Sequence, residues 1–320
     1  MMLLIKIILV LAVSAMTFQP MAAKKDELSY NLSRALEEAQ RGNKQSAMEY
    51  FNKEVTDNPK NGYAYMAMAA FHMDNSDYGE ARNAVESALK YLPKKDKGSH
   101  ARVLLFRGQL LTIECDTVGA YSDMATAIKL DPIKEEMYEK RAQLLYEQGR
   151  YDDADLAKRN YLKAMDDICK ALEIDSDSKA ISLMFLFPKD QLNLIVTKLK
   201  GLSVKYPNTG EYEYYIALLY QDKRMFVQSN EALERSFDRD AQGVVLEMIA
   251  DNYSEMGEYE IALETLDRAM QMSPDDDDLI ALYADMLGES GDIEGAISKW
   301  GRIYHQKSGF CLWLLSPWIL

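Results

Sequence analysis

The residue types that most often carry out chemistry in proteins are few in this chain and are not grouped. The three histidines, His72, His100 and His305, lie far apart, and none has a second ligand at metal-binding spacing. The sequence contains no Gly-x-Ser-x-Gly, Walker-type, His-Glu-x-x-His or Cys-x-x-Cys motif. We therefore expect structural or solvent-facing histidines, and no catalytic residue, metal site or cofactor.

Two runs of carboxylates are the remaining chemical candidates, Asp152-Asp153 and Asp275 to Asp278. The second run follows Pro274 and precedes a helical pattern, where acidic side chains cap free backbone N–H groups and complement the helix dipole. It lacks the alternating ligands of an EF-hand loop. Helix capping is the favoured interpretation of this run, and calcium binding is the alternative.

The cysteines are Cys115, Cys169 and Cys311. An odd and sparse set argues against a disulfide framework. We expect buried free thiols, while a Cys115–Cys169 pair stays open.

The overall charge excludes some classes of partner. The 320 residues carry a formal charge of −14, with an isoelectric point near 4.8, whereas the 48% hydrophobic content is ordinary for a folded protein. An acidic surface repels phosphate backbones and anionic lipid, so we expect no nucleic-acid partner. The 18 methionines and 20 tyrosines suit either adaptable contact surfaces or core filling.

The two ends of the chain are apolar. Residues 1–23 are predicted to be a signal peptide, because the apolar run from Leu3 to Ala15 is short for a bilayer span and Met21-Ala22-Ala23 resembles a cleavage site. We expect export to the periplasm, or otherwise to the cell envelope or the extracellular space, with a retained membrane anchor as the alternative.

Residues 308–320 form a hydrophobic tail. A truncated or altered reading frame is slightly favoured there over a folded-back cap or a contact with a membrane or partner.

A repeated pattern organises the rest of the chain. From Gly257 to Gly291 is 34 residues, and from Ala262 to Ala296 is 34 again. A fixed period of this size indicates a stacked array of helical hairpins. Helical spacing of apolar residues over 24–307 gives about eight units. Lys94 to Gly98 is read as a longer loop between units two and three.

Two units depart from the pattern. The fourth contains an insertion, read as a lengthened helix because Asp152 to Leu172 contains neither Gly nor Pro. The fifth, around Ile195, Leu199 and Pro207, is degenerate.

The repeat resembles that of the tetratricopeptide repeat family. Each repeat of this family has a first helix, helix A, and a second helix, helix B. In the seventh unit the family's large and small positions are occupied by Leu246, Ile249, Ala250 and Tyr253 in helix A, and by Tyr259, Ala262, Leu266, Ala269 and Pro274 in helix B. The resemblance covers about 280 residues and implies an all-α fold, a right-handed superhelical solenoid of about eight helix-turn-helix repeats. Where helix A ends, glycine can adopt the left-handed conformation, and Gly42, Gly149, Gly257 and Gly291 are assigned to these places.

The resemblance also implies a concave peptide groove lined by the A helices. By their positions within the repeat, the residues assigned to this groove are Tyr63, Met66, Met73, Arg102, Leu105, Gln143, Tyr146, Tyr214, Glu247 and Asp251, together with Glu139, Glu255 and Asp285. The expected groove is rich in aromatic and Met side chains in its N-terminal half and acidic at its C-terminal end. Some members hold a peptide's terminal carboxylate with a basic clamp, but the matching positions of this sequence are mostly neutral or acidic, which argues against that kind of ligand.

These observations predict a non-catalytic exported scaffold that binds a protein or peptide, with no stable membrane span after signal cleavage. The alternative is the recognition portion of a cell-envelope enzyme, for example a protease, whose catalytic domain is missing or separate. Structural self-assembly through the hydrophobic tail is a third, weaker possibility.

Overall fold

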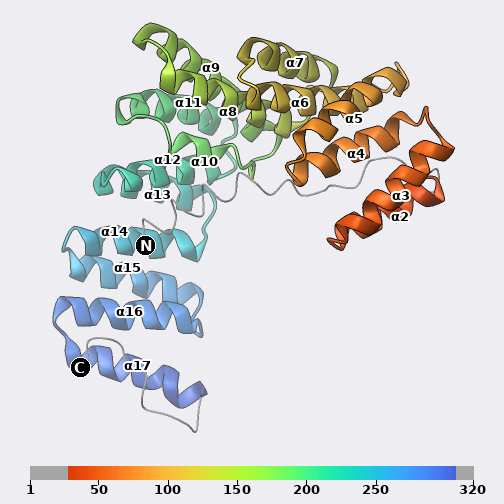
Figure 1. Ribbon diagram of the computed structural model, residues 1–320. Helices are drawn as coiled ribbons and strands as arrows, with labels where there is room; N and C mark the ends of the chain where they lie inside the picture. The colour runs from red at the N-terminus through yellow and green to blue at the C-terminus, as the bar shows by residue number, and fades with distance from the viewer. Residues whose placement is uncertain (1–27, 308–320) are drawn as a thin grey trace. The chain divides into compact units, whose positions relative to one another are not determined.

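The computed structural model describes residues 28–307, with side chains described to residue 301. Within this part the chain forms sixteen α-helices and one short 3₁₀ helix, and no strand. Successive helices pack as antiparallel pairs, such as α4 with α5 and α14 with α15 (Figure 1). The predicted signal peptide and hydrophobic tail both lie outside the described residues.

The helices divide between two compact units, which meet in sequence at Leu183 and Met184. Unit 1 contains the first four pairs: α2 (Tyr30–Gln40) with α3 (Lys44–Asp57), α4 (Gly62–Asp74) with α5 (Tyr78–Tyr91), α6 (Lys97–Ile113) with α7 (Thr117–Leu130), and α8 (Glu135–Tyr151) with α9 (Ala154–Ile174). Unit 2 contains the last three pairs: α12 (Glu211–Asp222) with α13 (Phe226–Arg239), α14 (Gly243–Glu255) with α15 (Tyr259–Met272), and α16 (Asp277–Ser290) with α17 (Ile293–Lys307).

The fifth repeat lies at the division between the units and is reduced. Its first helix, α10, spans only Ile181–Met184, followed by the 3₁₀ helix η2 (Lys189–Gln191) and by α11 (Leu192–Lys205). A single four-residue turn cannot supply the apolar face that a full A helix offers its neighbours. Seven helix pairs and this reduced repeat therefore agree with the predicted array of about eight units, and they divide between two compact units.

The fourth repeat carries the predicted lengthened helix. α9 has 21 residues, against 14 in α5, α7, α13 and α15. It begins at Ala154, two residues later than predicted, because Asp153 accepts hydrogen bonds from the backbone N–H groups of Asp155 and Leu156 and so caps the helix.

Most turns from helix A to helix B contain one residue in the left-handed conformation. In three turns this residue is a glycine, namely Gly42, Gly257 and Gly291, with φ values of 78°, 80° and 95°. In three others it is Ser76, Cys115 and Arg224, with φ values of 61°, 64° and 57°. A side chain in this conformation costs about 1–2 kcal/mol, so those three turns are held by the surrounding packing.

The assignment of Gly149 to such a turn was wrong. Gly149 is a buried residue inside α8, and a Cβ built on it would lie 2.5 Å from the ring of Tyr161 in α9. Glycine is needed here for the close approach of two helices and not for a turn.

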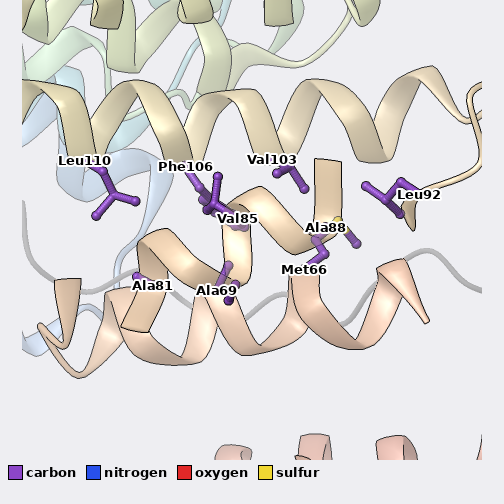
Figure 2. Packing of buried hydrophobic residues seen from close by; sticks show 10 residues of the cluster. Met66, Ala69, Ala81, Val85, Ala88, Leu92, Val103, Phe106 and Leu110 are labelled. Carbon is purple, nitrogen blue, oxygen red and sulfur yellow. The ribbon is translucent and has the colours of Figure 1, made fainter. Parts of the chain in front are cut away.

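Small residues set the spacing between helices throughout. Figure 2 shows Met66 and Ala69 of α4 facing Ala81 and Val85 of α5, with Phe106 of α6 closing the cluster. All of these side chains are at most 6% exposed. Burial of this apolar surface between three helices, at about 25 cal/mol per Å², stabilises a hairpin that could not cover its own face.

The cysteine expectation was wrong for Cys115, which is an exposed free thiol in the third A–B turn, while Cys169 is half-buried. No helix among residues 28–307 is both long and apolar enough to cross a membrane.

Candidate functional site

The structure separates the predicted groove residues by their exposure. Met66, Leu105 and Tyr146 are buried, at 4%, 0% and 7% exposed, so the prediction that they line a ligand surface was wrong. In unit 1 the A helix α6 contacts both α4 and α8 directly. Met66 and Leu105 therefore lie in the core, and the ring centroids of Tyr146 and Tyr161 are 6.0 Å apart.

The remaining predicted residues of unit 1 keep some exposure. The hydroxyl of Tyr63 donates to a carboxylate oxygen of Asp96 at 2.9 Å, and Met73 packs against the core cluster. Arg102, Glu139 and Gln143 are partly exposed. Burial raises the pKa of Glu139, despite the ammonium group of Lys140 at 3.9 Å.

In unit 2 the predicted residues reach the surface. Tyr214 of α12 and Glu247 of α14 are partly exposed, and Asp251, one helical turn after Glu247, is exposed. Burial raises the pKa of Tyr214. Desolvation by the surrounding protein raises the pKa of both Glu247 and Asp251, even though solvent reaches them.

Neighbouring carboxylates add to this effect. Asp276 and Asp278, at the start of α16, raise the pKa of Glu247 further. Glu255 and Glu289, at the ends of α14 and α16, do the same for Asp251. Acidic side chains of α14 and α16 therefore lie near one another. We call Glu247, Asp251, Glu255, Asp285 and Glu289 the acidic A-helix face.

Three members of the acidic A-helix face have partners within unit 2. Glu255 pairs with Arg224 at 2.9 Å, Glu289 accepts from the hydroxyl of Ser254 at 2.9 Å, and Asp285 accepts from the indole N–H of Trp300 at 3.2 Å. The carboxylates of Glu247 and Asp251 have neither a hydrogen bond nor an ion pair within the described residues. These two groups are thus available to a cation from outside.

Glu289 was missed by the sequence reasoning, although the repeat could have identified it. It lies 34 residues after Glu255, at the same repeat position, just as Asp285 lies 34 residues after Asp251. Extending the period from the predicted members would have completed the acidic A-helix face.

A buried polar network fixes the helices behind this face. Asn252, fully buried on α14, donates to the hydroxyl of Ser229 at 3.0 Å and to the amide oxygen of Asn230 at 2.7 Å. Gln221 of α12 donates to the amide oxygen of Asn252 at 2.9 Å. Such directional contacts hold α14 in one register against α12 and α13.

The described residues show no group of three or more potential metal ligands. Asp276, in the run considered for calcium, instead accepts hydrogen bonds from the backbone N–H groups of Asp278 and Leu279 at 3.0 and 3.2 Å. Helix capping is confirmed for this run.

His72 is buried, with its Nδ1 3.6 Å from a carboxylate oxygen of Asp77.

Comparison with known proteins finds similarity at the level of solved structures. No protein-family model matches the chain, and no curated protein matches it by sequence. A tetratricopeptide repeat protein from Parabacteroides merdae is 17% identical, covers 88% of this chain and 95% of its own, and has a TM-score of 0.37. The C-terminal part of a TPR repeat-containing protein from Cytophaga hutchinsonii is 13% identical, with coverages of 86% and 95% and a TM-score of 0.47. Yeast Tom70 is 17% identical, with coverages of 91% and 63% and a TM-score of 0.42.

The fold follows from the repeats of the chain itself. Small residues recur at one place of the A helices, the hairpins repeat mostly with a 34-residue period, and within each unit each pair packs on the next. The described part of the chain is an all-α solenoid of helix-turn-helix repeats of the tetratricopeptide type.

Proposed function

We propose that this protein is a non-catalytic scaffold that binds a basic segment of another protein at the acidic A-helix face. The repeats of unit 2 support the proposal because their successive A helices build one surface. The observation that carries it is the pair Glu247 and Asp251, two desolvated carboxylates on consecutive turns of α14 without a partner in the described fold.

The physical reason is electrostatic. A carboxylate in a partly desolvated place is costly when ionised, and the raised pKa of each group records this cost. A Lys or Arg side chain bound there would restore the lost interaction and lower both pKa values. Lys and Arg also favour charge-assisted hydrogen bonds with carboxylates, which are stronger than neutral ones.

The proposal includes export to a cell-envelope compartment. It rests on residues 1–23, whose apolar run and small residues before Lys24 have the pattern of a signal peptide. N-terminal sequencing of protein recovered from the native cell tests this part. A mature chain that begins near Lys24 and is released by outer-membrane disruption supports it, and an intact Met1 in the cytoplasmic fraction contradicts it.

Binding is tested with a fluorescent twelve-residue peptide of alternating Lys and Ser, followed by anisotropy. The double variant Glu247→Gln/Asp251→Asn should weaken binding at least about tenfold, because each hydrogen bond to a charged group contributes about 1.5–3 kcal/mol. The matched control is Glu231→Gln/Glu264→Gln, which removes the same charge from exposed positions on the B helices α13 and α15.

The comparison of the two double variants decides the matter. Equal weakening would mean that the peptide senses only the net charge of the protein, and the proposed site would be wrong. A peptide of alternating Glu and Ser should not bind. Crosslinking in the native compartment, through a photoreactive residue at Leu218 of α12, then identifies the natural partner.

A further inference from the structure

Beside the acidic A-helix face, unit 2 carries apolar side chains that a purely basic ligand would leave uncovered. Tyr214 and Leu218 of α12 are four residues apart, so they lie on the same side of that helix, and both are partly exposed. Val244, in the first turn of α14, is 46% exposed. We call Tyr214, Leu218 and Val244 the apolar stripe.

Two contacts place α12 beside α14. Gln221 lies seven residues after Tyr214, on the same side of α12, and its amide donates to the side-chain oxygen of Asn252 of α14 at 2.9 Å. Arg224, just after the end of α12, pairs with Glu255 at the end of α14 at 2.9 Å. The side of α12 that carries Tyr214 therefore borders α14.

On α14 the apolar and the acidic side chains share one side of the helix. Val244, Glu247 and Asp251 are three and then four residues apart, so they follow one another along it. Three residues after Asp251, the hydroxyl of Ser254 donates to Glu289 of α16 at 2.9 Å. The surface thus changes from apolar, on α12 and at the start of α14, to acidic, over the rest of α14 and on α16.

The aromatic member of the apolar stripe has the features of an interface residue. Desolvation raises the pKa of Tyr214, and its hydroxyl has no hydrogen-bond partner within the described residues. Tyrosine is enriched in protein interfaces because it combines an apolar ring with a polar tip. A single exposed apolar side chain is ordinary on a protein surface, but here three of them lie on the two helices that lead to the acidic A-helix face.

We propose that the ligand of unit 2 is an amphipathic segment, whose large apolar side chain contacts the apolar stripe while its Lys or Arg side chains pair with Glu247 and Asp251. This inference rests on the proposed function and adds the apolar part of the ligand. Charge complementarity sets the basic part over α14 and α16. Neighbouring helices are about 8–10 Å apart, a distance that an extended segment covers in about three residues. The apolar residue should therefore lie about three positions from the basic pair.

The test compares three peptides of equal charge, each followed by anisotropy with the full chain. The first is the peptide of alternating Lys and Ser, the second has Phe in place of two successive Ser residues, and the third has Asn at those two places. The Phe peptide should bind at least about fivefold more tightly than the other two, because the protein covers its rings. Added salt should weaken all three but preserve the ratio between them, since salt screens only the charged contacts.

Variants of the apolar stripe locate this gain. Tyr214→Ser/Val244→Ser should remove most of it and change the binding of the Lys and Ser peptide by less than about twofold. The matched control is Val227→Ser/Ile261→Ser, which removes apolar side chains that are 59% and 41% exposed on the B helices α13 and α15 and should keep the gain. Tyr214→Phe/Val244→Ile should also keep it, which separates loss of the contact from loss of structure.

The inference is overturned if the Phe and Asn peptides bind equally, if the gain survives in Tyr214→Ser/Val244→Ser, or if Val227→Ser/Ile261→Ser loses it to the same extent. In each of these cases the proposed function stands, provided that the Lys and Ser peptide still depends on Glu247 and Asp251. Binding of every peptide that is indifferent to Glu247→Gln/Asp251→Asn, or no binding at all, would instead refute the proposed function and this inference together.

Discussion

The first three repeats of unit 1 and the repeats of unit 2 use the same repeat position differently. We define the inner position as the residue three before the small buried residue of each A helix. In the first three repeats of unit 1 it is occupied by Leu32, Met66 and Leu105, which are at most 4% exposed. In the fourth repeat it is Glu139, and in unit 2 it is Tyr214, Glu247 and Ala281, all of which are partly exposed.

The difference teaches that repeat register and exposure are separate properties. In unit 1 the A helices touch one another, α2 with α4 and α4 with α6, so the inner position fills the space between them. In α12 and α14 the inner position carries polar groups, Tyr214 and Glu247, whose pKa values are raised by desolvation. The large apolar inner residues of the first three repeats thus contribute to the core, whereas these polar ones contribute to a surface.

The largest effect expected from this comparison is on stability. Leu105→Ala should reduce the free energy of unfolding by about 2–5 kcal/mol, because it leaves a cavity in a closely packed core. Glu247→Ala, at the equivalent position of unit 2, should change it by less than about 0.5 kcal/mol. Urea unfolding followed by circular dichroism measures both. Equal losses in the two variants would refute the contrast between the units.

A second comparison concerns the A–B turns. Gly291→Ala should destabilise unit 2 by about 1–2 kcal/mol, because it places a side chain in the left-handed conformation. Cys115→Gly should stabilise unit 1 by about 0.5 kcal/mol, since relief of the same conformation outweighs the extra freedom of the unfolded glycine. Thermal unfolding of the two variants should therefore shift in opposite directions. A lower Tm for Cys115→Gly would show that the turn is not strained.

The smallest effect is the pH dependence of the acidic A-helix face. A carboxyl group whose pKa is raised on folding, as for Glu247 and Asp251, binds its proton more tightly in the folded state than in the unfolded state. Its contribution to stability therefore falls as the pH rises from the ordinary carboxyl pKa of about 4 through the raised pKa. Glu247→Gln/Asp251→Asn should remove this fall and increase stability above that range by less than about 1 kcal/mol, because solvent screens both groups.

The measurement is urea unfolding at several pH values between 4 and 8. The control Glu231→Gln/Glu264→Gln should leave the slope unchanged. A steeper fall of stability in the Glu247→Gln/Asp251→Asn variant would contradict the sign of the two pKa shifts.

Much of the fold was predictable because it depends on local rules that repeat. The 34-residue period identified the hairpins, the lack of Gly and Pro identified the long helix α9, and the acidic run after Pro274 identified the cap at Asp276. Each depends on residues close together in sequence. Gly149 shows the limit of such rules, because its role is set by the ring of Tyr161 in the next helix.

The site was predicted less well because exposure depends on the distance between successive repeats. The repeat register assigns Met66 and Glu247 to the same inner position. The sequence of one A helix, however, does not determine how closely the next A helix approaches it.

The reduced fifth repeat has a consequence for how the chain unfolds. Stability passes along a solenoid through contacts between neighbouring repeats, and α10 offers only four residues to such contacts. We expect cooperativity to break there, so that urea denatures the two units in separate steps. Brief trypsin digestion should cut first near the exposed Lys189 and release two protected fragments, each with its own folding equilibrium.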